Sequence, residues 1–257
     1  MAITRTISAA TWNGWWGKLL YAPMLNLLVL FYTIIPGQDL GLAIIALTLL
    51  IRLILHPSYT QSIVAQHNLQ KVQPYIDKIR VDLKDDAQAQ SKAIMDIYKE
   101  HKVSPWGSCL PLLIQLPIIL ALYRVFVAGL DDKSLVHLYS WFPHPPTVLH
   151  TVFLGVVDLA HPSIYLAVAA GLAQFWQSWL TQKNMPTSNK AVGGMNPMMI
   201  TYMFPFITIF IGITLPAALS LYWTASTVFM AIEQLIIYRG LKRQDIEVIK
   251  TTHHGNS

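Results

Sequence analysis

The chain has 257 residues, of which 54% are hydrophobic and only 12% are charged, and its mean hydropathy is +0.44. Soluble domains carry about 25% charged residues, so this composition excludes an ordinary soluble protein and indicates a polytopic membrane protein. The single cysteine, Cys109, excludes a disulfide framework and a multi-cysteine metal site. The formal charge of +5 is read by its position along the chain rather than as a signal for nucleic-acid binding.

Residues 1–39 form an N-terminal segment with clustered tryptophans, which are typical of a membrane–water interface. No small-residue cleavage site follows a clean apolar core, so the segment does not read as a removable signal peptide. Its apolar part, 19–35, contains Pro23 and Asn26. From composition alone this part could span the bilayer or lie in the interface.

An apolar segment of membrane length, 40–58, contains Arg52. A spanning helix needs about 20 apolar residues, and an arginine near its centre costs roughly 2.5–3.5 kcal/mol on insertion scales. A guanidinium cannot escape this cost by losing its proton. One interpretation is that Arg52 snorkels to the headgroups, because Pro57 follows only five residues later. The other is that it faces a water-filled recess within the membrane.

The segment 59–105 is polar and basic, with seven of the eighteen Lys and Arg residues. Apolar residues recur at helical spacing on both sides of Lys84-Asp85-Asp86, which reads as a turn. The segment therefore predicts an antiparallel helical hairpin outside the bilayer.

Four further spans are predicted, with an extracytoplasmic loop after the first of them, a second loop after the next span, and a basic tail. In chain order these are 108–130, the loop 131–162, 164–181, the loop 182–197, 198–214, 217–238 and the tail 239–257. Arg124 lies near the far end of its span, where snorkelling explains it. The histidines of the first loop lack the i, i+3 or i+4 spacing of a helical metal site, so no metal is expected.

Thirteen of the eighteen basic residues fall in the hairpin, the 182–197 loop and the tail. The positive-inside rule places these three segments on the cytoplasmic side of the membrane. The 40–58 helix then runs from outside to inside.

Several predicted spans carry polar residues on one face. In the last span Ser220, Thr224 and Thr227 follow at i, i+4 and i+7, with Trp223 beside them. Singly, such residues form interhelical hydrogen bonds of ~0.6–2 kcal/mol. Together with Arg52 they predict a helical bundle with a hydrated groove open to the cytoplasm. The other members of these polar faces are Gln115, Gln174, Gln177, Ser178 and Thr201.

Glu233 is the only acid within the predicted spans, and it could pair with Arg52 or lie among the headgroups. The chain has no G-x-S-x-G or H-E-x-x-H motif, no intramembrane aspartate pair and no glycine-rich phosphate loop. An intramembrane hydrolase is therefore not supported, and neither an enzymatic activity nor a cofactor is expected.

Specific residue blocks carry a family resemblance: Leu49–Leu53 leading into a charged hairpin, Pro111–Pro117 (PLLIQLP), Leu219–Trp223 and Ile237–Leu241. In this order they resemble the YidC/Oxa/Alb family of membrane protein insertases. The resemblance implies an all-α membrane protein with a five-helix core, a cytoplasmic helical hairpin and an N-terminal interfacial helix. It also implies a hydrophilic groove that holds Arg52 and is lined by Gln115 and Trp223. The resemblance further implies the short bacterial form without a large periplasmic domain, located in the bacterial plasma membrane.

The resemblance implies nascent membrane proteins as substrates, with the ribosome and membrane lipids as further partners, and leaves a Sec translocon open. No specific nucleic-acid recognition is expected. The alternative function is a small-solute transporter or channel that uses Arg52 as a charge site. Such a transporter predicts internal repeats, and none is visible in the sequence.

Overall fold

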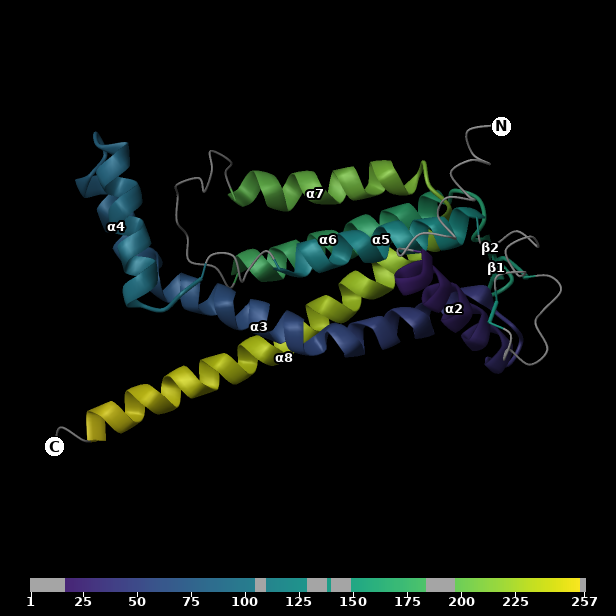
Figure 1. Ribbon diagram of the computed structural model, residues 1–257, viewed down its shortest axis with the longest axis horizontal. Helices are drawn as coiled ribbons and strands as arrows, with labels where there is room; N and C mark the ends of the chain where they lie inside the picture. The colour runs from purple at the N-terminus through teal and green to yellow at the C-terminus, as the bar shows by residue number, and fades with distance from the viewer. Residues whose placement is uncertain (1–16, 105–109, 129–137, 140–148, 184–196, 255–257) are drawn as a thin grey trace. The chain divides into compact units, whose positions relative to one another are not determined.

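The computed structural model describes residues 17–104, 110–128, 138–139, 149–183 and 197–254, which are helical apart from connecting turns and one short β-hairpin (Figure 1). The tryptophans before residue 17, Cys109, half of the predicted loop 131–162 and most of the predicted loop 182–197 lie outside these residues. In chain order the elements are η1 (Gly17–Tyr21), α2 (Ala22–Ile34), α3 (Leu40–Asp82), α4 (Ala87–Glu100), α5 (Leu110–Ala128), β1 (Val152–Phe153), β2 (Val157–Asp158), α6 (Ile164–Lys183), α7 (Pro197–Gly212) and α8 (Ala217–His254).

The chain divides into two compact units, and several helices contribute to both. The first unit comprises Met1–Ile54, Ile114–Phe175 and Met203–Phe229. The second comprises Leu55–Leu113, Trp176–Tyr202 and Met230–Ser257. Each unit is described separately below.

Helix α3 continues without interruption through the boundary predicted between the span 40–58 and the hairpin 59–105. Pro57 and Pro74 both lie inside it. A proline removes one backbone donor, but the buried face continues beyond Pro57 with Tyr59 and Ile63, which favours a continuous helix. The first arm of the hairpin is therefore the end of α3. In the same way, α8 extends past the predicted span to His254.

In the second unit the end of α3 and α4 form the two arms of a hairpin around residues 83–86. Asp86 caps α4, because its carboxylate accepts hydrogen bonds from the backbone N–H groups of Gln88 and Ala89. The Gln90 amide donates to the Arg80 and Leu83 carbonyls, at 3.3 and 3.2 Å. The ring of Tyr75 stacks on that of His101 at a centroid distance of 5.3 Å. These contacts join early α4 to the end of α3 and late α4 to an earlier turn of α3, so the arms are antiparallel.

Two described helices are long and apolar enough to cross a membrane, by length and composition: Gly17–Ile34 and α3. Leu113–Val127 and Tyr202–Gly212 are shorter apolar helices. Helix α6 is long enough, but its polar residues, such as Gln174 and Gln177, lower its hydropathy. The segment 19–35 thus satisfies the criterion for a span, and its predicted interfacial placement stays a prediction.

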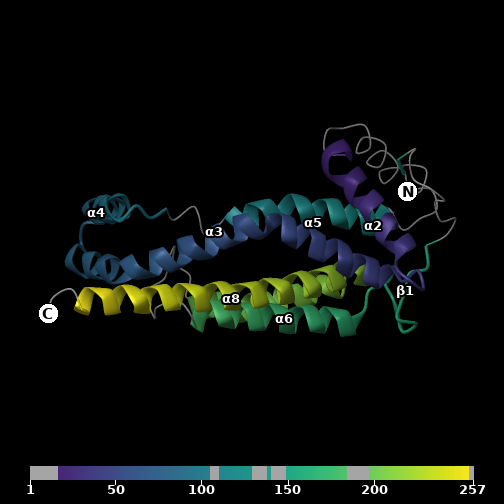
Figure 2. The same cartoon turned by 90° about the horizontal axis from the view of Figure 1, so that it is seen from below.

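The first unit contains a β-hairpin that the sequence did not predict, beside the start of α3 (Figure 2). Its turn is closed by a hydrogen bond of 3.0 Å from the Val156 N–H to the Phe153 carbonyl. The two residues between them, Leu154 and Gly155, have φ of +50° and +74°. This is the conformation of a type I′ turn, which favours Asn-Gly. A leucine in this left-handed region costs roughly 1–2 kcal/mol.

The strand end of the same hairpin carries an aspartate–histidine pair. Asp158 accepts hydrogen bonds from the Ala160 N–H at 3.0 Å and from the His161 ring at 2.6 Å. The backbone hydrogen bond, and after it the one from His161, hold the pKa of Asp158 below its ordinary value.

The ring of Phe153 packs directly on Gly41, in the first turn of α3. A Cβ at Gly41 would overlap that ring, whereas a Cβ at Gly240 of α8 would meet nothing within 4 Å. We expect Gly41→Ala to destabilise the protein by about 1–3 kcal/mol through overpacking. Gly240→Ala should be neutral or stabilising by about 0.5–1 kcal/mol. Thermal unfolding in detergent measures the stability of both variants. Adding Phe153→Ala to Gly41→Ala should restore part of the lost stability. Equal stability of Gly41→Ala and Gly240→Ala would contradict this packing.

Candidate functional site

Arg52 lies in the first unit, in the membrane-length part of α3, and is only 4% exposed. Its Nε donates a hydrogen bond of 2.9 Å to Oγ of Ser226, and its Nη2 also contacts this oxygen. The Nη2 group donates a second hydrogen bond, of 2.9 Å, to Oε1 of Gln115. These bonds join α3 to α8 and α5. Neither acceptor carries a charge, so neither neutralises the guanidinium.

The network continues beyond the guanidinium to Tyr222. The Nε2 group of Gln115 donates a hydrogen bond of 2.6 Å to the Tyr222 hydroxyl, and Tyr222 is 2% exposed. Because the Gln115 oxygen accepts from Arg52 while its nitrogen donates, the amide orientation is set by both neighbours. Arg52, Ser226, Gln115 and Tyr222 form one polar cluster, called the arginine cluster below.

The guanidinium of Arg52 is directed toward protein side chains. A snorkelling arginine extends its charged group away from the protein core toward the headgroups. Arg52 instead turns inward, to side chains of α5 and α8. The arginine is therefore held by polar protein partners.

The other predicted residues of α8 and α6 in this unit form a second group. Trp223 Nε1 donates a hydrogen bond of 3.2 Å to Gln174 Oε1. The Thr224 hydroxyl donates to the Ser220 carbonyl at 2.8 Å, a bond within its own helix. Thr227 is 1% exposed, and its hydroxyl has no hydrogen-bond partner among the described residues. These side chains are thus distinct from the arginine cluster.

A recess in the first unit lies beside this second group. It is lined by the side chains of Ser220, Trp223 and Thr208 together with apolar residues of α6, α7 and α8. Arg52 is not among its lining residues. The predicted hydrated groove around the guanidinium therefore stays a proposal.

In the second unit Gln177 and Thr181 of α6 form a polar group with Gln234 of α8. Gln177 Nε2 donates to the Thr181 hydroxyl at 3.3 Å, and Gln234 Nε2 donates to the same oxygen at 3.0 Å. Ser178 lies half-buried between the first two. Thr201 lies in α7, but its side chain is outside the described part of the chain.

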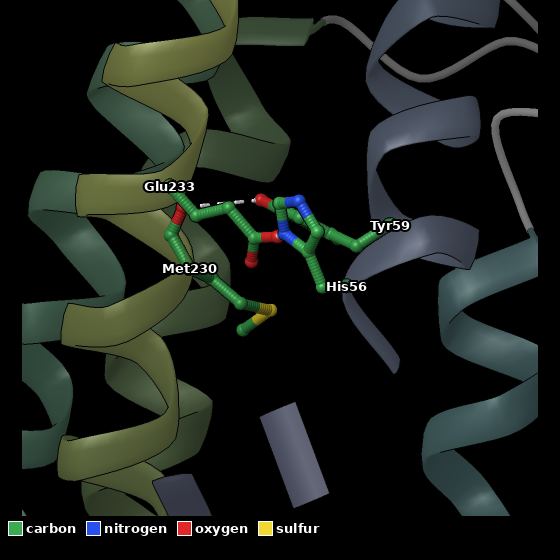
Figure 3. A network of polar contacts seen from close by, with 4 residues as sticks. All are labelled: His56, Tyr59, Met230 and Glu233. Carbon is green, nitrogen blue, oxygen red and sulfur yellow. Dashed lines mark hydrogen bonds and ion pairs between the residues drawn. The ribbon is translucent and has the colours of Figure 1, made fainter. Parts of the chain in front are cut away.

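Glu233 contacts His56 in the second unit. Its carboxylate Oε1 forms a hydrogen-bonded pair with Nδ1 of His56, and the two side chains point toward each other (Figure 3). The Glu233 side chain is 7% exposed, whereas that of His56 is 54% exposed. One turn further, the Tyr59 hydroxyl donates to the Met230 carbonyl at 3.3 Å. The pairing of Glu233 with Arg52 stays a prediction.

Gln234 of the second unit was not selected from the sequence, and neither were Ser226, Tyr222 and His56. Tyr222 and Ser226 are four apart on α8, as are Arg52 and His56 on α3. This i, i+4 spacing of polar side chains on one face is the signal that could have found them. The face chosen from the sequence was the neighbouring one, with Ser220 and Thr224.

The described part of the chain is a helical protein with polar groups buried between apolar helices, and two of its helices are long and apolar enough to cross a membrane. The family model described as 60Kd inner membrane protein matches residues 30–244. A Clostridium tetani protein named membrane protein insertase YidC is 36% identical over 232 residues, which cover 85% of this chain and 94% of that protein. The chain belongs to the YidC/Oxa/Alb family of membrane protein insertases.

A Histophilus somni protein of the same name is 32% identical over 234 residues, covering 90% of this chain and 39% of that protein. A crystal structure of an active YidC insertase matches with a TM-score of 0.57 and 27% identity, covering 86% of this chain and 46% of that one. The chain therefore spans about two fifths of the length of relatives such as that from Histophilus somni. The activity of these longer relatives is therefore assigned to this chain as a proposal.

We expect Ser226→Ala to destabilise the protein, because it removes an acceptor from a buried guanidinium. The loss should be about 1–3 kcal/mol. The matched control is the adjacent Thr227→Val, which should not lower stability, because it removes a buried hydroxyl without a described partner. Thermal unfolding in detergent compares the two, and a similar loss for both would contradict the assigned role of Ser226.

His56→Ala is expected to destabilise the second unit by about 1–2 kcal/mol, because it removes a partner from a buried carboxylate. His56→Asn is the control, since its amide nitrogen can occupy the position of Nδ1 and should retain part of the stability. If His56→Ala unfolds at the same temperature as the unchanged protein, the His56–Glu233 pair does not contribute to stability.

Proposed function

We propose that the chain is a membrane protein insertase that moves short hydrophilic segments of nascent membrane proteins part-way across the bilayer. Such a segment cannot cross hydrocarbon unaided, because each unsatisfied backbone group there costs several kcal/mol. The arginine cluster offers hydrogen-bond donors and acceptors within the membrane-length part of α3. The identity of relatives named membrane protein insertase supports the proposal.

The observation that carries the proposal is the set of acceptors around Arg52. Ser226 and Gln115 bind the guanidinium as neutral groups. A carboxylate adds an opposite charge and can accept two parallel hydrogen bonds from a guanidinium, which a hydroxyl or an amide oxygen cannot offer. An acidic residue of a substrate can therefore replace these acceptors with a net gain. In this proposal the cluster opens into a groove on the cytoplasmic side, and Gln174 and Trp223 line its wall.

The apolar part of the substrate follows a different surface in the same proposal. It slides along α6 and α8, and on α6 the exposed side chains of the first unit include Leu172, which is 64% exposed. Transfer of a spanning helix into lipid supplies the free energy, so no nucleotide is required.

The helical hairpin and the C-terminal tail face the cytoplasm in this proposal, as the positive-inside rule predicts. No residue of α4 is buried, so its lysines are available to charged partners. The ribosome and anionic lipid headgroups are the partners with the matching charge. We favour insertion over small-solute transport because the relatives that match along most of this chain are named insertases.

The test replaces Arg52 by Ala and by Lys, with Arg124→Ala as the control. Arg124 is an exposed arginine of α5, outside the arginine cluster. In vesicles with a reconstituted translation system, Arg52→Ala should lower insertion of a substrate with an acidic translocated segment about tenfold, corresponding to ~1.4 kcal/mol. Arg52→Lys should restore part of it, and Arg124→Ala should have no effect.

A substrate whose translocated segment has its acidic residues replaced by Ser separates charge attraction from general polarity. Replacement of Arg52 should lower the insertion of this neutral substrate less than the insertion of the acidic substrate. Unchanged insertion of both substrates by Arg52→Ala would contradict the proposed role of the cluster.

A further inference from the structure

The β-hairpin of the first unit exposes only apolar side chains at its tip. Val152, Leu154 and Val156 are 46%, 63% and 83% exposed. No charged residue lies between Thr151 and Val157. The one aromatic residue of the tip, Phe153, is turned the other way and packs on Gly41. The tip therefore has an inner face bound to α3 and an outer face of three unpartnered apolar side chains.

Hydrogen bonds fix this hairpin to the first turns of two helices. Asp39 links it to α3, because its carboxylate accepts from the Leu42 N–H at 3.0 Å and from the Leu154 N–H at 2.7 Å. The strand end is linked to α8, whose Ala217 and Ala218 N–H groups donate to the His161 and Leu159 carbonyls, both at 3.0 Å. These hydrogen bonds thus fix the position in which the tip is exposed.

The turn itself contains a residue that its conformation does not favour. Leu154 occupies the first left-handed position of a type I′ turn, where asparagine is the preferred residue. Strained residues of this kind persist where the surrounding structure determines them, often at functional sites. In water, a leucine at this position is unfavourable for two reasons. Its backbone is in the left-handed region, and its apolar side chain is exposed.

The position of the hairpin indicates what covers this face. Helices α3 and α8 begin at its anchors, and α6 begins six residues after β2, with Ile164 and Tyr165 53% and 80% exposed. In a membrane protein, the first turns of spanning helices that start together lie at the boundary between headgroups and hydrocarbon. An exposed tyrosine is typical of this boundary.

We propose that the hairpin tip inserts Val152, Leu154 and Val156 into the lipid leaflet at which α3, α6 and α8 begin. The ligand is the boundary between phospholipid headgroups and acyl chains. The hairpin then fixes the depth of α3 through Asp39. Arg52 follows thirteen residues later, about 20 Å along the helix, so the tip also sets the depth of the arginine cluster. This proposal does not depend on the insertase activity.

Site-directed fluorescence in lipid vesicles tests the insertion. In a Cys109→Ser background, Val156→Cys is labelled with an environment-sensitive fluorophore and the protein is reconstituted into phosphatidylcholine vesicles. We expect a blue-shifted emission that nitroxide-labelled lipid quenches more strongly than iodide in the buffer does. Leu172→Cys on α6 serves as the lipid reference, and Met95→Cys on α4 as the water reference; the two positions are 64% and 55% exposed.

A matched variant distinguishes the effect of the apolar Leu154 side chain from that of the turn conformation. Leu154→Asn suits the type I′ turn and should keep or raise the unfolding temperature, yet it should reduce lipid quenching at position 156. Iodide quenching at Val156→Cys equal to that at Met95→Cys would place the tip in water. Protection from both quenchers would show a protein cover instead, and either result would overturn the proposal.

Discussion

A guanidinium that cannot lose its charge, placed in a helix of membrane length, imposes the main constraint on the first unit. Such a group is tolerated only when hydrogen bonds replace its water, and here these bonds come from Ser226 and Gln115. Because the two acceptors belong to α8 and α5, the burial of Arg52 specifies how three helices face one another. Gln115 in turn orients Tyr222, which extends the constraint along α8. One charge therefore accounts for the polar cluster and for the facing of α3, α5 and α8 within it.

The second unit follows the same rule with a charge of opposite sign. The carboxylate of Glu233 is buried in an apolar stretch of α8 and is covered by the half-exposed ring of His56. Gln177, Thr181 and Gln234 satisfy one another nearby. Most of the polar residues named in these helices are therefore arranged in small hydrogen-bonded groups, which lowers the cost of burying them, and Thr227 is a described exception. In the proposed mechanism, a substrate exchanges with such groups near Arg52.

Much of this arrangement could be predicted from periodicity and composition, but the contacts across helices could not. Arg52 and Gln115 were both selected, because a charge and an amide in apolar segments are conspicuous. Helical spacing alone does not say which of two adjacent polar faces of α8 turns toward α3, so the face with Ser226 was missed. Helix α3 exceeded its predicted end since buried residues on both sides of Pro57 outweigh one lost backbone donor. The two-residue strands of the hairpin are too short for any alternation to show.

The central claim is that a hydrophilic segment of a nascent chain enters the arginine cluster. The most direct measurement is site-specific photocrosslinking from Gln115 to a ribosome-stalled nascent membrane protein, with Leu120 of the same helix, 60% exposed, as the lipid-facing comparison. The account predicts that the probe at Gln115 crosslinks the polar translocated segment and that the probe at Leu120 does not. Crosslinks to that segment from Leu120 alone, or equally from both positions, would contradict it.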